Sequence, residues 1–328
     1  MELELLSTLR GRKENVWRTF LEAAGLEPDA GVARTALIWE GETLVAAGSR
    51  QGNVLKCIAV APDHQGEGLT ATLITALRQD AFREGHRHLF LYTKPGNAFQ
   101  FSSLFFYPVA QTDRVLLMES RKDGIRQFVD ALPADPGEGI TGAAVMHCNP
   151  FTLGHRYLIE QAARECRQLY VFVLSEAGGQ FSPEERMDMV KAGTADLPNV
   201  TVLPTGPYLL SAATFPTYFL KEKEQLPKIQ CELDIAVFAR YYAPKLGITR
   251  RYVGTEPLSP STRQYNLALQ EQLPQWGIQV REIPRLEQGT QPVSASRVRS
   301  LLAEGRGAQI RDLVPPTTWE YLRTRGWL

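Results

Sequence analysis

The sequence predicts an α/β protein of two domains, an α+β domain followed by a domain built on a parallel sheet. Its 328 residues are enough for about two domains. The segment Leu132–Gly139 holds two prolines and two glycines between apolar segments, which is typical of a linker. After this segment, short apolar runs alternate with helical patterns, as in a parallel sheet covered on both faces. We therefore expect domains at 1–131 and 140–328, joined by a linker at 132–139.

The first domain is expected to combine hairpin strands with a helix. Two apolar runs flank Glu40, Gly41 and Glu42, and this pattern suits a hairpin. Apolar residues then recur at helical spacing and predict a helix over Leu69–Glu84. The strands predicted for this domain are Thr35–Glu40, Thr43–Gly48, Val54–Val60, Leu89–Tyr92 and Val115–Met118.

The second domain is expected to alternate strands and helices. Helical spacing predicts a helix over Gly154–Cys166. Another helix is predicted to start after Ser182, because a capping serine is followed by Pro183 and then by Glu185 at the capping-box position. Ligands of such a domain lie at the carboxyl ends of its strands. The predicted strands are Ile140–Met146, Leu169–Leu174, Val200–Leu203, Asp234–Phe238, Arg251–Val253 and Gln279–Glu282.

The composition argues against several classes of protein. Lys plus Arg and Asp plus Glu each number 36, so the chain lacks the basic excess of a nucleic-acid binder or a polybasic membrane-surface protein. No apolar run approaches the roughly 18 residues of a membrane span, and the N-terminus lacks the order of a signal peptide. The four cysteines are scattered without a CxxC pair, which argues against disulfides and zinc. We expect a cytoplasmic protein with neither nucleic acid nor membrane as a partner.

The stretch from Met146 to Ile159 is the most informative part of the sequence. It lies where a predicted strand ends and a helix begins. A helix N-terminus presents unpaired backbone N–H groups and can hold phosphate. Gly154 would let a ligand approach the backbone closely, and His155 would lie in the first helical turn. These residues therefore predict an anion site at the end of the first strand of this domain.

Two segments resemble motifs of the nucleotidyltransferase superfamily. Asn149 to His155 is similar to its (H/T)xGH signature, which implies that Thr152 and His155 contact the ATP phosphates and stabilise the transition state at the α-phosphorus. Val293 to Arg299 is similar to the ISSTxxR motif, although Ala295 replaces a serine of that pattern. In the family this motif grips the β- and γ-phosphates. The matching positions are Ser294, Ser296 and Arg299.

The resemblance to the citrate lyase ligase family is closer and covers nearly the whole chain. It rests on the run CNPFTLGHRYLIEQAA, on Phe181–Arg186 and on the segment that begins at Tyr252. It implies an enzyme that uses ATP and Mg²⁺ to attach acetate, through acetyl-AMP, to the thiol of the prosthetic group on the citrate lyase acyl carrier subunit. Mg²⁺ would be held by substrate and water, with no protein metal site. The implied catalytic residues are His155, Thr152 and Arg299, and the expected ATP-binding residues are Asn149, Pro150, Phe151, Gly154, Gly254, Glu256, Ser294 and Ser296.

A further resemblance concerns the first domain. Val60–Leu69 is similar to the coenzyme A loop of GNAT acetyltransferases, in which Gln65, Gly66 and Gly68 match the pattern and Thr70 replaces a glycine or alanine. Backbone amides of this loop would hold a pyrophosphate. We expect this domain to bind the coenzyme-A-like arm of the carrier, and the sequence leaves open whether it is also catalytic.

Two other activities stay open at this point, as does a regulatory module that binds the nucleotide or the carrier without turnover, against which Thr152, His155, Ser296 and Arg299 argue. One is adenylyl transfer of the kind used in coenzyme A or NAD synthesis, in which the product keeps AMP. The other is N-acetyl transfer by the first domain, which would consume acetyl-coenzyme A without ATP. Acetate-dependent release of pyrophosphate and AMP would separate the ligase from both.

Overall fold

The computed structural model spans residues 1–328 and describes all of them except 30, 210–217, 221–225, 257–258 and 289–290. It consists of two compact units. The first comprises Met1–Ile125 together with the described residues of Phe215–Leu233, and the second comprises the remainder. The boundary along the chain therefore falls earlier than the expected 131. Residues 132–139 form no helix or strand, and they count with the second unit because Arg167 and Tyr170 hold Asp135.

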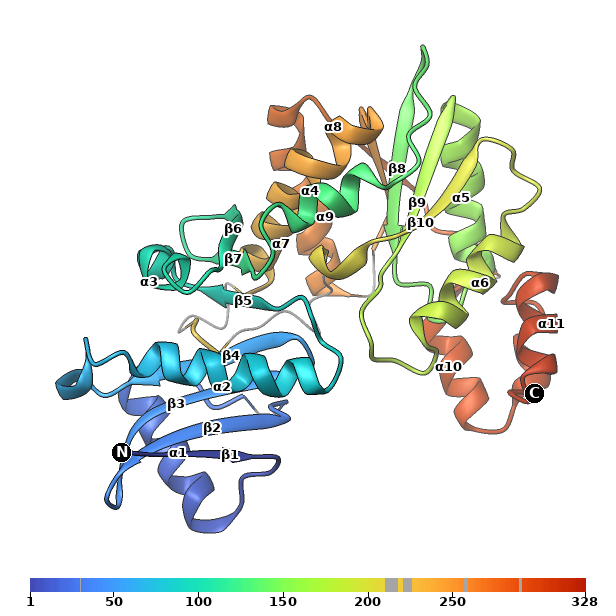
Figure 1. Ribbon diagram of the computed structural model, residues 1–328. Coiled ribbons are helices and arrows are strands. Elements are labelled where there is room, and N and C mark those ends of the chain that lie inside the picture. The colour runs from blue at the N-terminus through green and yellow to red at the C-terminus, as the bar shows by residue number, and fades with distance from the viewer. Residues whose placement is uncertain (30, 210–217, 221–225, 257–258, 289–290) are drawn as a thin grey trace. The chain divides into compact units, whose positions relative to one another are not determined.

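The first unit is an α+β structure around a seven-stranded mixed sheet with the order β1-β2-β3-β4-β5-β7-β6. Helix α2 packs against β2, β3 and β4 and covers the core on one face (Figure 1). The elements are β1 (Glu2–Leu6), α1 (Gly11–Ala23), β2 (Arg34–Glu40), β3 (Thr43–Gln51), β4 (Val54–Val60), α2 (Leu69–Arg83), β5 (Phe90–Thr93), α3 (Ala98–Ser102), β6 (Tyr107–Gln111) and β7 (Leu116–Glu119).

Strands β4 and β5 separate along their length and leave a gap in this sheet. These strands are parallel, and they pair only at Val54 with Phe90 and at Leu55 with Leu91. Beyond Leu55 and Leu91 the two strands no longer pair, and the residues that follow line a pocket, as described below. The predicted β2–β3 hairpin is also present, with Glu40 opposite Thr43 and Gly41 at a positive φ of 59°.

The second unit is a doubly wound α/β structure. Its five-stranded sheet has the order β10-β9-β8-β11-β12, and every pair of neighbouring strands is parallel. Helices α5 and α6 lie on one face of the sheet and α9 on the other (Figure 1). Two helices cross the division between the units, because the starts of α4 (Gly124–Asp130) and α7 (Leu226–Val237) count with the first unit. The other elements are β8 (Thr141–Met146), α5 (Leu153–Glu165), β9 (Gln168–Val173), α6 (Pro183–Gly193), β10 (Val200–Pro204), α8 (Ala243–Leu246), β11 (Arg250–Gly254), α9 (Pro260–Gln272), β12 (Gln279–Ile283), β13 (Glu287–Gln288), β14 (Gln291–Pro292), α10 (Ala295–Ala303) and α11 (Pro316–Thr324).

The parallel sheet confirms the predicted α/β class. All six residues of β9 are buried, because helices cover both faces of this strand, and its sequence therefore reads as a continuous apolar run. The predicted helix start at Ser182 is present. The Ser182 hydroxyl accepts a hydrogen bond from the backbone N–H of Glu185, and the Glu185 carboxylate accepts one from the backbone N–H of Ser182.

One predicted strand is wrong. Asp234–Phe238 belongs to α7 and to the π-helical turn Phe238–Tyr242 that continues it. A short apolar run fits a buried strand and a buried helix equally well, because both elements can bury residues all around. Ile235, Val237 and Phe238 are indeed buried.

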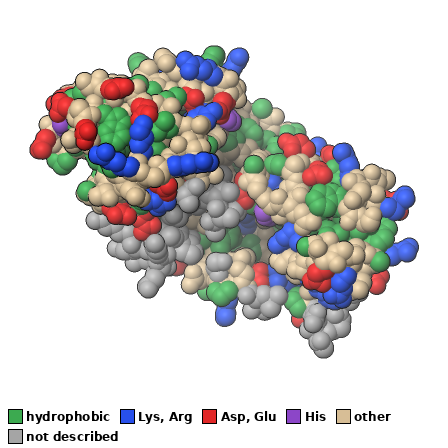
Figure 2. All heavy atoms as spheres, turned by 90° about the horizontal axis from the view of Figure 1, so that it is seen from below, with side chains coloured by type: hydrophobic (Ala, Val, Ile, Leu, Met, Phe, Trp, Pro, Cys, Tyr) green, Lys and Arg blue, Asp and Glu red, His purple; other side chains and the backbone are tan. Residues whose placement is uncertain are grey.

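The surface carries charges of both signs. Figure 2 shows Lys and Arg side chains interspersed with Asp and Glu on the face it presents. None of the described helices combines the length and the apolar character that a membrane crossing requires.

Candidate functional site

The turn between β8 and α5 positions His155. Thr152 is the N-cap residue of α5, and its backbone N–H donates a hydrogen bond to Nδ1 of His155 at 3.1 Å. The backbone N–H of His155 donates in return to Oγ1 of Thr152 at 3.4 Å. This arrangement is a capping box in which a histidine takes the place of glutamate or glutamine. Because Nδ1 accepts a hydrogen bond, the neutral ring carries its proton on Nε2.

The surroundings of His155 keep its ring neutral. Burial lowers the pKa of His155 to about 4, and electrostatic interactions with Arg285 and His147 act in the same direction. His155 therefore offers an uncharged Nε2–H donor at neutral pH. Phe151 lies parallel to the ring, with the two ring centres 6.0 Å apart.

This pKa shift predicts a pH-dependent stability. Between pH 6.5, the ordinary value for histidine, and about pH 4, the unfolded chain binds a proton at His155 that the folded chain does not bind. The free energy of unfolding should therefore fall as the pH is lowered through this interval. Urea unfolding at pH 7.5 and at pH 5 measures this change. The free energy of unfolding should fall less between these pH values for His155→Gln than for the unmodified chain. Equal losses in the two proteins would contradict the shift.

The start of α10 lies against the same turn. Ser294 is its N-cap residue and accepts a hydrogen bond from the backbone N–H of Arg297 at 3.3 Å. A Cβ atom on Gly154 would lie 2.9 Å from the carbonyl oxygen of Val293, which is too close for any other residue without displacement of the backbone. The two motifs are thus in direct contact, although about 140 residues separate them in the sequence.

Arg299 connects α10 with the turn after β8. Its Nη1 donates a hydrogen bond to the carbonyl oxygen of Asn149 at 2.6 Å, and its Nη2 donates to Oγ of Ser296 at 3.3 Å. The side chain is half-buried. A guanidinium group is thereby fixed beside the N-termini of α5 and α10, where backbone N–H groups also favour an anion.

A pocket of about 260 Å³ lies at the carboxyl ends of β8, β11 and β12. It brings together Thr152, Gly154 and His155 from the first motif and Ser294 from the second. Gly254, the last residue of β11, and Glu256, which follows this strand, also line it. These predicted site residues therefore share one concave surface at the edge of the sheet where ligands of such folds bind.

Other predicted residues lie behind this surface. Phe151 is completely buried, and its ring packs against Gly193. Asn149 is also buried, and its Oδ1 accepts a hydrogen bond from the backbone N–H of Phe181 at 3.1 Å. Asn149, Pro150, Phe151, Ser296 and Arg299 are not among the described residues that line the pocket. Asn149 and Phe151 thus shape the turn from within the core.

Three basic residues of the lining were not predicted from the sequence. Arg285 follows β12 and forms a two-pronged ion pair with Glu256, with Nη2 2.8 Å from Oε2. His147 follows β8, and burial and the charge of Arg186 lower its pKa. Arg251 lies within β11. The position of Arg285, two residues past a strand end, matches that of Glu256 after β11, so the rule about strand ends could have identified it.

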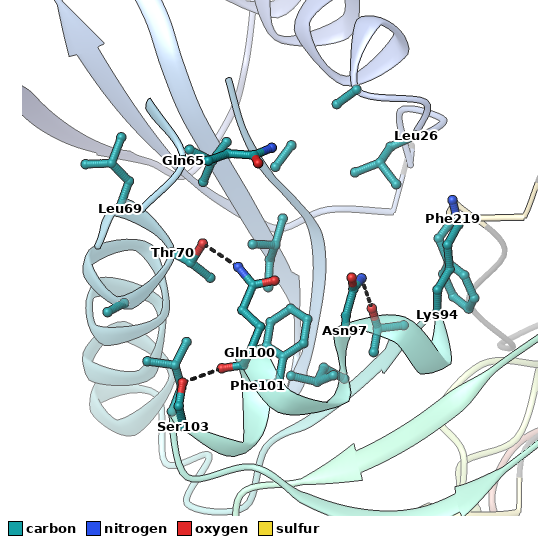
Figure 3. A pocket seen from close by; sticks show the side chains of 18 of the residues that line it. Leu26, Gln65, Leu69, Thr70, Lys94, Asn97, Gln100, Phe101, Ser103 and Phe219 are labelled. Atoms are coloured by element: carbon teal, nitrogen blue, oxygen red, sulfur yellow. Dashed lines mark hydrogen bonds between the residues drawn. The ribbon is translucent and has the colours of Figure 1, made fainter. Parts of the chain in front are cut away.

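The first unit has a second pocket, lined by Gln65, Gly66 and Gly68 (Figure 3). Gly66 and Gly68 have φ values of 88° and 76°, in the region that favours glycine. Thr70 lines the same pocket, and its hydroxyl accepts a hydrogen bond from Nε2 of Gln100 at 3.0 Å.

A distant segment completes this pocket. Tyr218 and Phe219 belong to its lining, and the hydroxyl of Tyr218 donates a hydrogen bond to the carbonyl oxygen of Tyr92 at 2.8 Å. The backbone N–H of Glu27 donates to the carbonyl oxygen of Tyr218 at 2.7 Å. The pocket of the first unit therefore includes residues that follow β8, β9 and β10 of the second unit in the sequence.

Comparison with known proteins agrees with both units. Residues 141–322 match the family described as citrate lyase ligase C-terminal domain, and residues 17–100 match the acetyltransferase (GNAT) family. The chain is 42% identical to the [citrate [pro-3S]-lyase] ligase of Klebsiella pneumoniae over 318 residues, which cover 95% of this chain and 92% of that protein. The chain belongs to the citrate lyase ligase family.

Two further members of the family are similar over nearly their full lengths. The ligase of Escherichia coli (strain K12) is 39% identical, with 93% of this chain and 88% of that protein covered. The ligase of Haemophilus influenzae is 37% identical, with 99% of each covered. The family assignment confirms the predicted ligase class of enzyme, and the GNAT match confirms an acetyltransferase-like first domain.

Proposed function

We propose that this chain uses ATP to attach acetate to the thiol of the prosthetic group on the acyl carrier subunit of citrate lyase, and thereby activates citrate lyase. The observation that carries the proposal is the pocket in which His155 and Thr152 meet Ser294 at two helix N-termini. The names of the related ligases support this choice of substrate. A cytoplasmic location stays a prediction.

In the first step, a carboxylate oxygen of acetate attacks the α-phosphorus of ATP. The bond from this phosphorus to the bridging oxygen breaks, and pyrophosphate leaves with the bonding electrons, which gives acetyl-AMP. Such a reaction requires alignment and stabilisation of charge more than covalent help. Nε2–H of His155 donates to an α-phosphate oxygen, and Thr152 together with the first amides of α5 assists it.

The remaining predicted residues hold the nucleotide. Ser294, Ser296 and Arg299 bind the leaving pyrophosphate at the N-terminus of α10, and Gly154, Gly254 and Glu256 line the site of the nucleotide. Asn149, Pro150 and Phe151 support the phosphate-binding turn, in keeping with their buried positions.

Mg²⁺ would neutralise phosphate charge. Among the described lining residues the acidic one is Glu256, and its carboxylate is engaged by Arg285. These residues do not form a cage for the ion, so we expect phosphate oxygens and water to hold it.

In the second step, the carrier thiol loses its proton and the sulfur attacks the acetyl carbonyl carbon. The bond from this carbon to the AMP oxygen breaks, and a thioester and AMP result. The pyrophosphate-binding loop of the first unit, with Gln65, Gly66 and Gly68, would bind the coenzyme-A-like arm that carries the thiol.

The role of this loop is testable by substitution. Gly66→Leu and Gly68→Leu should raise the KM for carrier protein roughly tenfold, the loss expected for about one hydrogen bond to a phosphate, and leave the KM for ATP unchanged. Gly85→Leu is the matched control, because Gly85 has a similar φ of 87° and equally open space but does not line the pocket. An unchanged KM for carrier in both variants would exclude the docking role.

The activity itself is tested with ATP, Mg²⁺, acetate and thiol-form carrier protein. We expect the carrier to gain the mass of one acetyl group while AMP and pyrophosphate form in equal amounts. Adenylylation of phosphopantetheine or of a mononucleotide without acetate would instead support coenzyme synthesis. Acetyl transfer from acetyl-coenzyme A without ATP would support an acetyltransferase.

A further inference from the structure

Arg251 is a buried cation in the wall of the catalytic pocket. It is the second residue of β11, and only 2% of it is exposed. Its Nε has no hydrogen-bond partner among the residues that the structure describes. Burial of a guanidinium N–H group is unfavourable unless it is paired, so the unpaired Nε–H of Arg251 is available to an acceptor from outside the chain.

The neighbours of Arg251 leave it available to a ligand. Its guanidinium carbon lies 4.5 Å from the centre of the Phe238 ring, which covers one face of the group. Asp234 is buried in the same region and interacts electrostatically with Arg251. However, the carboxylate of Asp234 accepts a hydrogen bond from the hydroxyl of Tyr265. Among the described residues, no ion pair joins Asp234 to Arg251.

The pocket places this cation near the reacting groups. Arg251 and Tyr265 line the same 260 Å³ space as His155 and Thr152. The N-termini of α5 and α10 already provide groups for phosphates, so the buried guanidinium is free to bind a different anion.

We propose that Arg251 binds the carboxylate of the short-chain acid substrate and orients one of its oxygens toward the α-phosphorus. The planar fork of a guanidinium group matches the two oxygens of a carboxylate, and Tyr265, which lines the same pocket, limits the size of the acid that fits beside it. This inference rests on the proposed function, because it names the residue that recognises the acid in that reaction.

The test compares steady-state kinetics of acetate-dependent pyrophosphate formation in the full-length enzyme. Arg251→Met should raise the KM for acetate about 10- to 100-fold, as expected for a lost charge-assisted contact, and should leave the KM for ATP within about twofold. Arg250→Met is the matched control, because Arg250 adjoins Arg251 on β11 but pairs with Glu165 and does not line this pocket. The control should keep the KM for acetate.

Arg251→Lys is the second variant, for the event that Arg251→Met does not fold. It keeps the positive charge but removes the planar guanidinium group that matches the two carboxylate oxygens. This variant should also raise the KM for acetate, and acetamide, a neutral analogue, should not compete with acetate in the unmodified enzyme. A normal KM for acetate in Arg251→Lys, or a rise in the KM for ATP alone, would overturn the assignment while the proposed function stands. Absence of acetate-dependent pyrophosphate formation in the unmodified enzyme would overturn both.

Discussion

Replacement of His155 by alanine is expected to lower kcat for acetyl-AMP formation about 10²–10³-fold, the usual effect of removing one preorganised donor. The neutral ring presents Nε2–H because Nδ1 accepts the backbone N–H of Thr152 and the pKa is lowered to about 4. Because the donor is uncharged and fixed by the cap, it should stabilise the transition state more strongly than it stabilises the complex with bound ATP. The KM for ATP should therefore change little.

A second variant separates catalysis from capping. His155→Gln keeps a side chain that can accept the N–H of Thr152, as in an ordinary capping box, but removes the imidazole. We expect its thermal stability to stay close to that of the unmodified chain while its kcat falls as far as that of His155→Ala. The measurement is the initial rate of pyrophosphate release alongside the melting temperature. Near-normal kcat in His155→Gln would show that the cap, and not the donor, is what the reaction needs.

Replacement of Arg299 by alanine is expected to lower the rate of pyrophosphate formation about 10²-fold, because a cation beside the leaving group is lost. It should also reduce the free energy of unfolding by about 1–2 kcal/mol, because the hydrogen bond to the carbonyl oxygen of Asn149 is removed. Both effects have one origin, since the side chain joins α10 to the turn before α5.

Arg297→Ala provides the control for Arg299. Arg297 lies on the same helix and is exposed, so its removal changes the net charge equally. We expect it to retain both rate and stability in parallel assays of pyrophosphate release and urea unfolding. Equal losses of rate in the two variants would mean that general charge, and not the position of Arg299, supports the reaction.

The sequence predicted most of the fold because its elements carry strong local signals. Gly154–Cys166 and Leu69–Glu84 show helical periods that burial on one face produces, and they correspond to α5 and α2. Asp234–Phe238 was assigned wrongly because a run buried on all sides has no period that distinguishes a helix from a strand. The role of Tyr218 and Phe219 in the first unit could not be predicted, because the local sequence does not determine which distant sheet a segment packs against.

The same contrast applies to the candidate site. Thr152, His155 and Ser294 were predicted because they belong to contiguous motifs at helix starts, and the structure places them in one pocket. Arg251 and Arg285 are isolated arginines in the sequence, and they reach this pocket only because parallel strands end side by side. Asn149 and Phe151 share the motif with His155, yet their side chains turn into the core.

The central claim is that acetate forms acetyl-AMP before the thiol reacts. Acetate labelled with ¹⁸O in both carboxylate oxygens tests it most directly, with the AMP analysed by mass spectrometry after reaction with ATP and carrier protein. If a carboxylate oxygen attacks the α-phosphorus and the thiol then attacks the carbonyl carbon, the attacking oxygen stays on phosphorus. The expected result is AMP that carries one ¹⁸O atom for each acetyl group transferred. Unlabelled AMP, formed while the carrier is acetylated, would contradict the acetyl-AMP route.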